Sequence, residues 1–98
     1  GLNSQQTSFE LFKSGKSIVE IASERGMAVS TIEGHLAQFV GTGELQLDRL
    51  VDPKKSKAIL DYIEKHNTRG MNEIRAGLGN NYSYSEIRFV IKHLEANR

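Results

Sequence analysis

The stretch IVEIASERGMAVSTIEGHL, residues 18–36, sets two short apolar helices on either side of a glycine. Apolar residues recur in this stretch at helical spacing, and the pattern extends to Phe39 just beyond it. These residues are Ile18, Ile21, Ala22, Val29, Ile32, Leu36 and Phe39. Gly26 supplies the positive φ that reverses the chain, and the small Ala22 lets two helices cross closely. The pattern predicts a helix-turn-helix. The second helix of such a motif usually enters the DNA major groove, but the same three-helix core also serves as a docking module.

The length of 98 residues allows one compact domain or two small three-helix units. The absence of cysteine excludes disulfides, thiolate zinc sites and a cysteine nucleophile, and it fits a reducing cytoplasm. No apolar run approaches the roughly twenty residues needed to cross a bilayer, and no signal-peptide pattern is present. We therefore expect a cytoplasmic protein without a membrane partner. Because the first residue is Gly1, we expect residues 1–6 to be a disordered or cloning-derived start to a piece of something longer.

Charge is divided unequally along the chain. Residues 1–50 hold four Lys and Arg against six Asp and Glu, a net charge of −2, whereas residues 51–98 hold nine against six, a net charge of +3. Any attraction to phosphate should therefore lie in the second half.

Capping boxes predict four helix starts, because a Ser or Thr side chain caps one backbone N–H and a Glu three residues later reaches back to another. They pair Thr7 with Glu10, Ser17 with Glu20, Ser30 with Glu33, and Ser83 with Glu86. The third helix should end near Val40, before the glycines at 41 and 43. The last continues to about residue 94.

Two more helices follow from other signals. Asp52 and Pro53 form a strong helix start, and the apolar spacing continues to about His66. A shorter helix follows Gly70 and is closed by Gly79. In residues 44–50 the leucines alternate as in a strand without an obvious partner, so we interpret this segment as a vestigial wing or a linker.

The two halves repeat one plan. Three residues of the first half correspond loosely to three of the second, as Ile21, Gly26 and Ile32 do to Ile74, Gly79 and Ile87. We therefore predict an all-α fold of about six helices. The helices form tandem helix-turn-helix-like units at 7–50 and 51–98, with the second packed on the first.

Several motifs together resemble a known family. They are GKSI at 15–18, STIEGHL at 30–36, GEL at 43–45, VDP at 51–53 and YSYSEIR at 82–88. The chain from about Thr7 to Leu94 thus resembles the C-terminal helix-turn-helix domain of bacterial RecQ-type DNA helicases. The first motif alone also resembles response-regulator DNA-binding domains, but those end after one four-helix unit. The resemblance implies a non-catalytic accessory domain of an ATP-dependent DNA helicase, one that helps the enzyme engage DNA.

The predicted recognition helix offers few groups for reading bases. Direct readout favours Arg, Lys, Asn or Gln near the start of that helix. The candidates here are Ser30, Thr31, His35 and Gln38, with the last two on or near a solvent face. The alternative interpretation is that this helix belongs to a purely structural core.

The basic candidates lie in the second half. They are Lys54, Lys55, Lys57, Arg69, Arg75, Arg88 and Lys92. Arg88 and Lys92 are four residues apart on one helix, so one phosphate could bridge them, although an ordinary solvated face explains them equally. Tyr82 and Tyr84 could stack on an unpaired base, or pack in the core.

The leading hypothesis is binding to DNA, single-stranded, duplex or forked, through backbone phosphates with weak sequence preference. The alternative is a docking module for the helicase core or a repair protein. A transcription regulator would need a dimerisation helix, which we do not find. We expect no enzyme activity, no metal and no cofactor, because no nucleophile and base pair, phosphate loop or metal cluster is recognisable.

Overall fold

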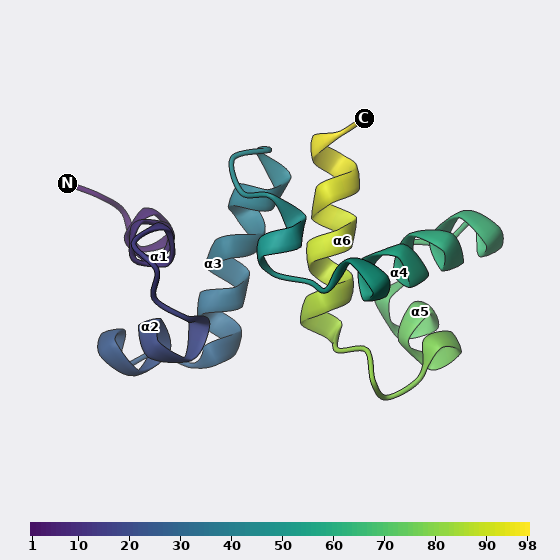
Figure 1. Cartoon of the computed structure of the whole chain (residues 1–98), viewed down its shortest axis with the longest axis horizontal. Helices are drawn as coiled ribbons and strands as arrows, with labels where there is room; N and C mark the ends of the chain where they lie inside the picture. The colour runs from purple at the N-terminus through teal and green to yellow at the C-terminus, as the bar shows by residue number, and fades with distance from the viewer.

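The computed structural model describes residues 1–98 and is entirely helical, with no strand. Figure 1 shows six α-helices joined by short turns, in agreement with the predicted fold class. A single turn of 3₁₀-helix, η1, lies between the third and fourth. The elements are α1 (Ser4–Lys13), α2 (Ile18–Arg25), α3 (Val29–Gly41), η1 (Leu47–Arg49), α4 (Pro53–His66), α5 (Met71–Leu78) and α6 (Tyr84–Ala96).

Helices α1 to α3 form the first three-helix group. The capping box of Ser17 and Glu20 starts α2 as predicted. Gly26 ends α2 in the left-handed conformation, with φ of 64°, so it makes the turn into α3. Ile21 and Ile32, on either side of this turn, are fully buried in the common core. The glycine turn and the two apolar stripes therefore build the predicted helix-turn-helix.

Helices α4 to α6 repeat the arrangement. Asp52 caps α4 ahead of Pro53, and the capping box of Ser83 and Glu86 starts α6, both as predicted. Ile74 and Ile87 are fully buried, like their counterparts in the first group. The turn between α5 and α6 spans residues 79–83, two residues longer than the turn at 26–28.

Two predicted capping boxes are wrong. Helix α1 starts at Ser4, because Asn3 and Gln6 form the box instead of Thr7 and Glu10. Residues 4–6, expected to belong to a disordered or cloning-derived start, are therefore helical. Helix α3 starts at Val29 without a side-chain cap. The carboxylate expected to cap it, that of Glu33, instead accepts a hydrogen bond of 2.8 Å from the Ser85 hydroxyl on α6.

The segment at 44–50 is a linker and not a wing. It contains η1 and no strand. Leu45 and Leu47 alternate in the sequence because both side chains are buried in the common core, which also includes Val51. The segment thus connects the two groups and fills space between them.

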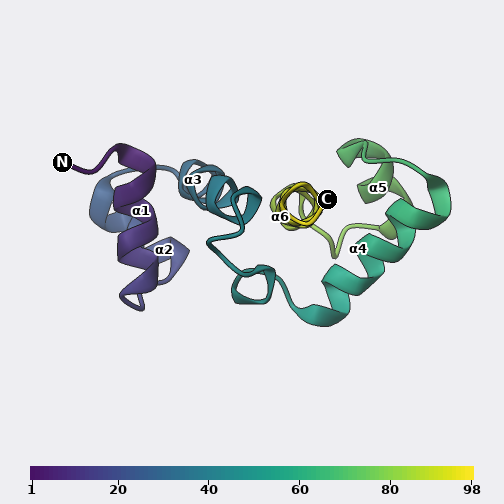
Figure 2. The same ribbon diagram turned by 90° about the horizontal axis from the view of Figure 1, so that it is seen from above.

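Helices α3 and α6 join the two groups by packing side by side. Both run in the same direction, so their N-termini lie at the same end (Figure 1), and the view from above looks along both helices at the centre of the molecule (Figure 2). Ala37 and Val40 of α3 and Phe89 of α6 are almost fully buried. The second helix of each helix-turn-helix is therefore packed against its counterpart.

Candidate nucleic-acid interface

Helix α3 occupies the position of a recognition helix, but one side of it is covered. Its Glu33 is bonded to α6, and a Cβ added at Gly41 would lie 3.4 Å from the Lys92 side chain. A recognition helix enters the major groove by presenting an open outer face. Because α6 packs along α3, part of the α3 surface is not available for entry into a groove.

The open side of α3 carries Thr31 and Gln38, both exposed and seven residues apart. Ser30 is exposed in the first turn. Gly34 lies between Thr31 and Gln38 on the same side at helical spacing. These hydroxyl and amide groups suit contacts to phosphate and sugar, while Gln38 is the one amide available for a base edge.

His35 is half-exposed, and its ring is bonded to a neighbouring helix. Its Nδ1 atom is 2.8 Å from the Ser8 hydroxyl on α1, and that hydroxyl is 2.6 Å from the Arg25 Nη1 atom on α2. Since guanidinium only donates, Ser8 accepts from Arg25 and has its own proton left to donate to Nδ1. Burial, and then the charge of Arg25, lower the pKa of His35. The His35 side chain therefore takes part in a hydrogen-bond chain that links the three helices of the first group.

The three lysines at the start of α4 differ in their surroundings. Lys55 donates to the Asn81 carbonyl oxygen at 2.6 Å and forms an ion pair with Glu86 at 3.2 Å, so it ties α4 to the start of α6. Lys57 pairs with Asp61 at 2.7 Å, which raises the pKa of Lys57 through the hydrogen bond and then the opposite charge. The Lys54 ammonium has no partner. One of the three cations is thus free.

Arg69 lies exposed between α4 and α5 and makes no hydrogen bond or ion pair. Figure 2 places that turn at the far end of the molecule from α1 and α2. Arg69 is therefore separated from the candidate groups of α3.

Arg88 and Lys92 lie along the border between α3 and α6. Arg88 is exposed, makes no ion pair, and has its Nη1 atom 3.9 Å from where a Cβ of Gly34 would be. Lys92 lies beside Gly41 and pairs with Glu95 at 3.2 Å. We call this border, with Thr31, Gly34, Gln38, Tyr84, Arg88 and Lys92, the α3–α6 seam.

Tyr82 and Tyr84 differ in their exposure to solvent. Tyr82 is half-buried and packs against the core. Tyr84 is 44% exposed, and the Arg75 guanidinium lies over its ring at 4.9 Å from the centroid. From the sequence, Arg75 is one basic candidate among several. Its contact with Tyr84 depends on how α5 packs beside α6, which no local pattern reveals.

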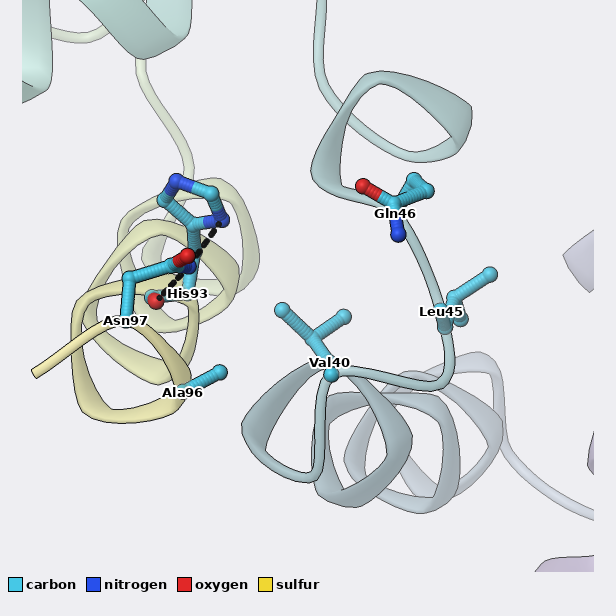
Figure 3. Close-up of a pocket in the computed structure, with 7 residues that line it drawn as sticks. Val40, Leu45, Gln46, His93, Ala96 and Asn97 are labelled. Carbon is cyan, nitrogen blue, oxygen red and sulfur yellow. Dashed lines mark hydrogen bonds between the residues drawn. The ribbon is translucent and has the colours of Figure 1, made fainter.

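A separate cavity lies at the other end of α3 and α6. Its volume is about 330 Å³, including the part open to solvent. Figure 3 shows the side chains of α6 facing those of α3 and the linker, with the Asn97 amide bonded to the His93 carbonyl oxygen at 2.8 Å. The residues that line this cavity are Val40, Gly43, Leu45, Gln46, His93, Ala96 and Asn97. No group of three or more His, Asp or Glu side chains could hold a metal ion, and no helix is sufficiently long and apolar to span a membrane.

The fold defines a class, that of all-α domains with two helix-turn-helix units in tandem. The comparison with protein families gives the particular family. The model described as "Helix-turn-helix domain" matches residues 4–91, and the chain belongs to this family. Membership indicates nucleic-acid binding in general, and no catalytic family is identified. Comparisons with curated proteins and with solved structures give no match.

Proposed function

We propose that this chain is a non-catalytic nucleic-acid-binding accessory domain that contacts backbone phosphates with weak sequence preference. Membership of the helix-turn-helix family is the observation that carries the proposal. The packing of α3 on α6 supports phosphate contact over base reading, because it leaves α3 with hydroxyls and a single amide on its open side.

The distribution of unpaired cations supports the second half of the chain as the surface that attracts phosphate. Several Lys and Arg side chains there make no hydrogen bond or ion pair within the molecule. They are Lys54, Lys65, Arg69, Arg88 and Arg98. In the first half only Arg49 lacks both, and it lies over the Phe12 ring at 5.4 Å from the centroid. Free cations release condensed counterions when they meet phosphates, so they supply the salt-dependent part of the affinity.

We further propose that the parent protein is a RecQ-like DNA helicase and that the domain acts on DNA in the cytoplasm. The motifs at 30–36, 51–53 and 82–88 support this assignment through their resemblance to the helicase-associated domain. The complete open reading frame provides a test. Helicase motor motifs preceding this segment are expected, and a reading frame without them would remove the assignment.

Docking to the helicase core or to a repair protein is the second candidate. The covered side of α3 favours it, since a helix-turn-helix that does not read bases is free to act as a scaffold. The exposed large apolar side chains are Leu2, Val19, Val29 and Tyr84, and they belong to different elements. A docking site usually presents a contiguous apolar patch of several hundred Å². Because no two of these side chains share an element, we favour nucleic acid over docking.

A salt titration tests phosphate binding. Affinity for labelled single-stranded, duplex and forked DNA is measured over a range of salt concentrations. We expect a steep fall with salt, and the slope should decrease by about 0.7 to 0.9 for each phosphate contact removed by Arg88→Ala or Lys92→Ala. Lys16→Ala is the matched control, because Lys16 lies in the first half and is already paired with Glu24 at 3.5 Å. No binding to any of these DNAs at low salt would reject the proposal in favour of docking.

A further inference from the structure

Tyr84 is an exposed aromatic side chain held in place. The Arg75 guanidinium lies over its ring, and the Arg75 Nε atom donates a hydrogen bond of 2.9 Å to the Tyr82 carbonyl oxygen. An exposed tyrosine ordinarily samples several rotamers, so ordering its ring against a ligand has an entropic cost. Here Arg75 holds the Tyr84 ring before any ligand binds, which reduces this entropic cost. The residue as a whole is 44% exposed, so Tyr84 is accessible at the surface.

Arg88 and Lys92 continue from Tyr84 along the same side of α6. The three residues are spaced by four positions, which corresponds to a rise of about 6 Å each. Arg88 makes no ion pair, while Lys92 shares its charge with Glu95. An aromatic ring followed by two cations is the arrangement with which proteins bind an unpaired strand, by stacking a base and neutralising the neighbouring phosphates.

Gly34 completes the other side of the seam. It lies in the interior of α3 with no positive φ, and a Cβ there would meet only the Arg88 Nη1 atom, at 3.9 Å. Neither the backbone conformation nor the packing therefore requires glycine, although glycine destabilises a helix relative to alanine. Because the fold does not require glycine at this position, and because an unpaired arginine lies beside it, Gly34 is consistent with close approach of a ligand to the α3 backbone.

We infer that the α3–α6 seam binds one unpaired nucleic-acid strand. Tyr84 stacks on a base, Arg88 and Lys92 contact the phosphates that follow, and Gly34 allows the sugar-phosphate backbone to lie against α3. The inference rests on the proposed function and adds to it the form of the ligand. It distinguishes a single strand from a duplex, whose bases are stacked internally and unavailable to Tyr84.

The test compares a labelled oligothymidylate with a labelled duplex of equal length by fluorescence anisotropy. The wild-type domain is expected to bind the single strand more tightly. Tyr84→Ala should lower single-strand affinity about 5- to 150-fold while duplex affinity stays the same. Tyr84→Phe keeps the ring and should retain binding. Gly34→Ala should weaken single-strand binding without lowering the melting temperature, which separates a ligand role from a folding role.

The outcomes separate the inference from the proposed function. Binding of both DNAs by the wild type, with Tyr84→Ala changing neither or both equally, would overturn the single-strand site and leave phosphate binding intact. Binding of neither DNA would overturn both. Circular dichroism of each variant confirms that the fold is retained, and Lys16→Ala, at a lysine paired with Glu24, controls for the general loss of surface charge.

Discussion

Replacing Gly34 by alanine should stabilise the protein. The position is interior to α3 and the added Cβ has room, with its nearest neighbour 3.9 Å away at Arg88 Nη1. Alanine is favoured over glycine in a helix by about 0.5 to 1 kcal/mol, chiefly because glycine loses more conformational freedom on folding. For a domain of this size each kcal/mol shifts the melting temperature by about 4–8 °C. The variant should therefore melt several degrees above the wild type.

Gly77→Ala is the matched control with the opposite expectation. Gly77 is also within a helix, α5, so the gain in helix propensity is the same. An added Cβ would overlap the ring of Tyr62, which stacks on His66 at 4.0 Å between ring centroids. Overpacking of this kind costs about 1–3 kcal/mol, which offsets or exceeds the gain. Gly77→Ala should therefore be less stable than Gly34→Ala by about 1–3 kcal/mol.

Thermal unfolding followed by helical circular dichroism measures both variants under identical conditions. The order expected is Gly34→Ala above wild type, with Gly77→Ala at or below it. A lower melting temperature for Gly34→Ala would refute the reasoning, since it would mean that α6 lies too close to α3 to admit a methyl group. In that case Gly34 would be required for packing, and its presence would no longer support a ligand site beside α3.

Three further predictions concern the framework. The pKa of His35 is lowered in the folded state, so the neutral imidazole stabilises the fold fully above the ordinary value of 6.5 and this stabilisation is lost as the pH falls below it. His35→Gln should reduce the loss, which urea unfolding between neutral and mildly acidic pH measures. Gly26→Ala places a Cβ at φ of 64° and should cost about 1–2 kcal/mol, measured by urea unfolding. Ile87→Ala empties a fully buried site and should cost about 2–5 kcal/mol; a loss below 1 kcal/mol would contradict its central position.

Local signals made much of the fold predictable. The capping boxes at Ser17 and Ser83 and the Asp52-Pro53 start depend on atoms within three residues of each other, so the sequence alone contains them. Gly26 was predictable for the same reason, because its left-handed conformation is a property of one residue.

The errors arose where a distant residue competed for the same group. The pattern at Ser30 matched a capping box, but Ser85 of α6 bonds the Glu33 carboxylate instead. His35 lies near solvent as expected, but its hydrogen bond to Ser8 of α1 was not anticipated. Both partners come from helices distant in sequence, and their positions follow only from the packing.

The candidate site was predictable in its parts and not in its arrangement. Arg88 and Lys92 were recognisable together because they are four residues apart on one helix. The pairing of Lys55 with Glu86, which occupies one expected phosphate ligand, depends on α4 lying beside α6. The same holds for the support that Arg75 gives to Tyr84.

The central claim is that nucleic acid binds along the α3–α6 seam and not through an isolated recognition helix. The most direct measurement is NMR titration of the isotope-labelled domain with a short single-stranded DNA. The account predicts that the largest chemical-shift changes occur at Thr31, Gly34, Tyr84 and Arg88, with little change in α1 and α2. Changes concentrated in α1 and α2, with the seam unaffected, would contradict it.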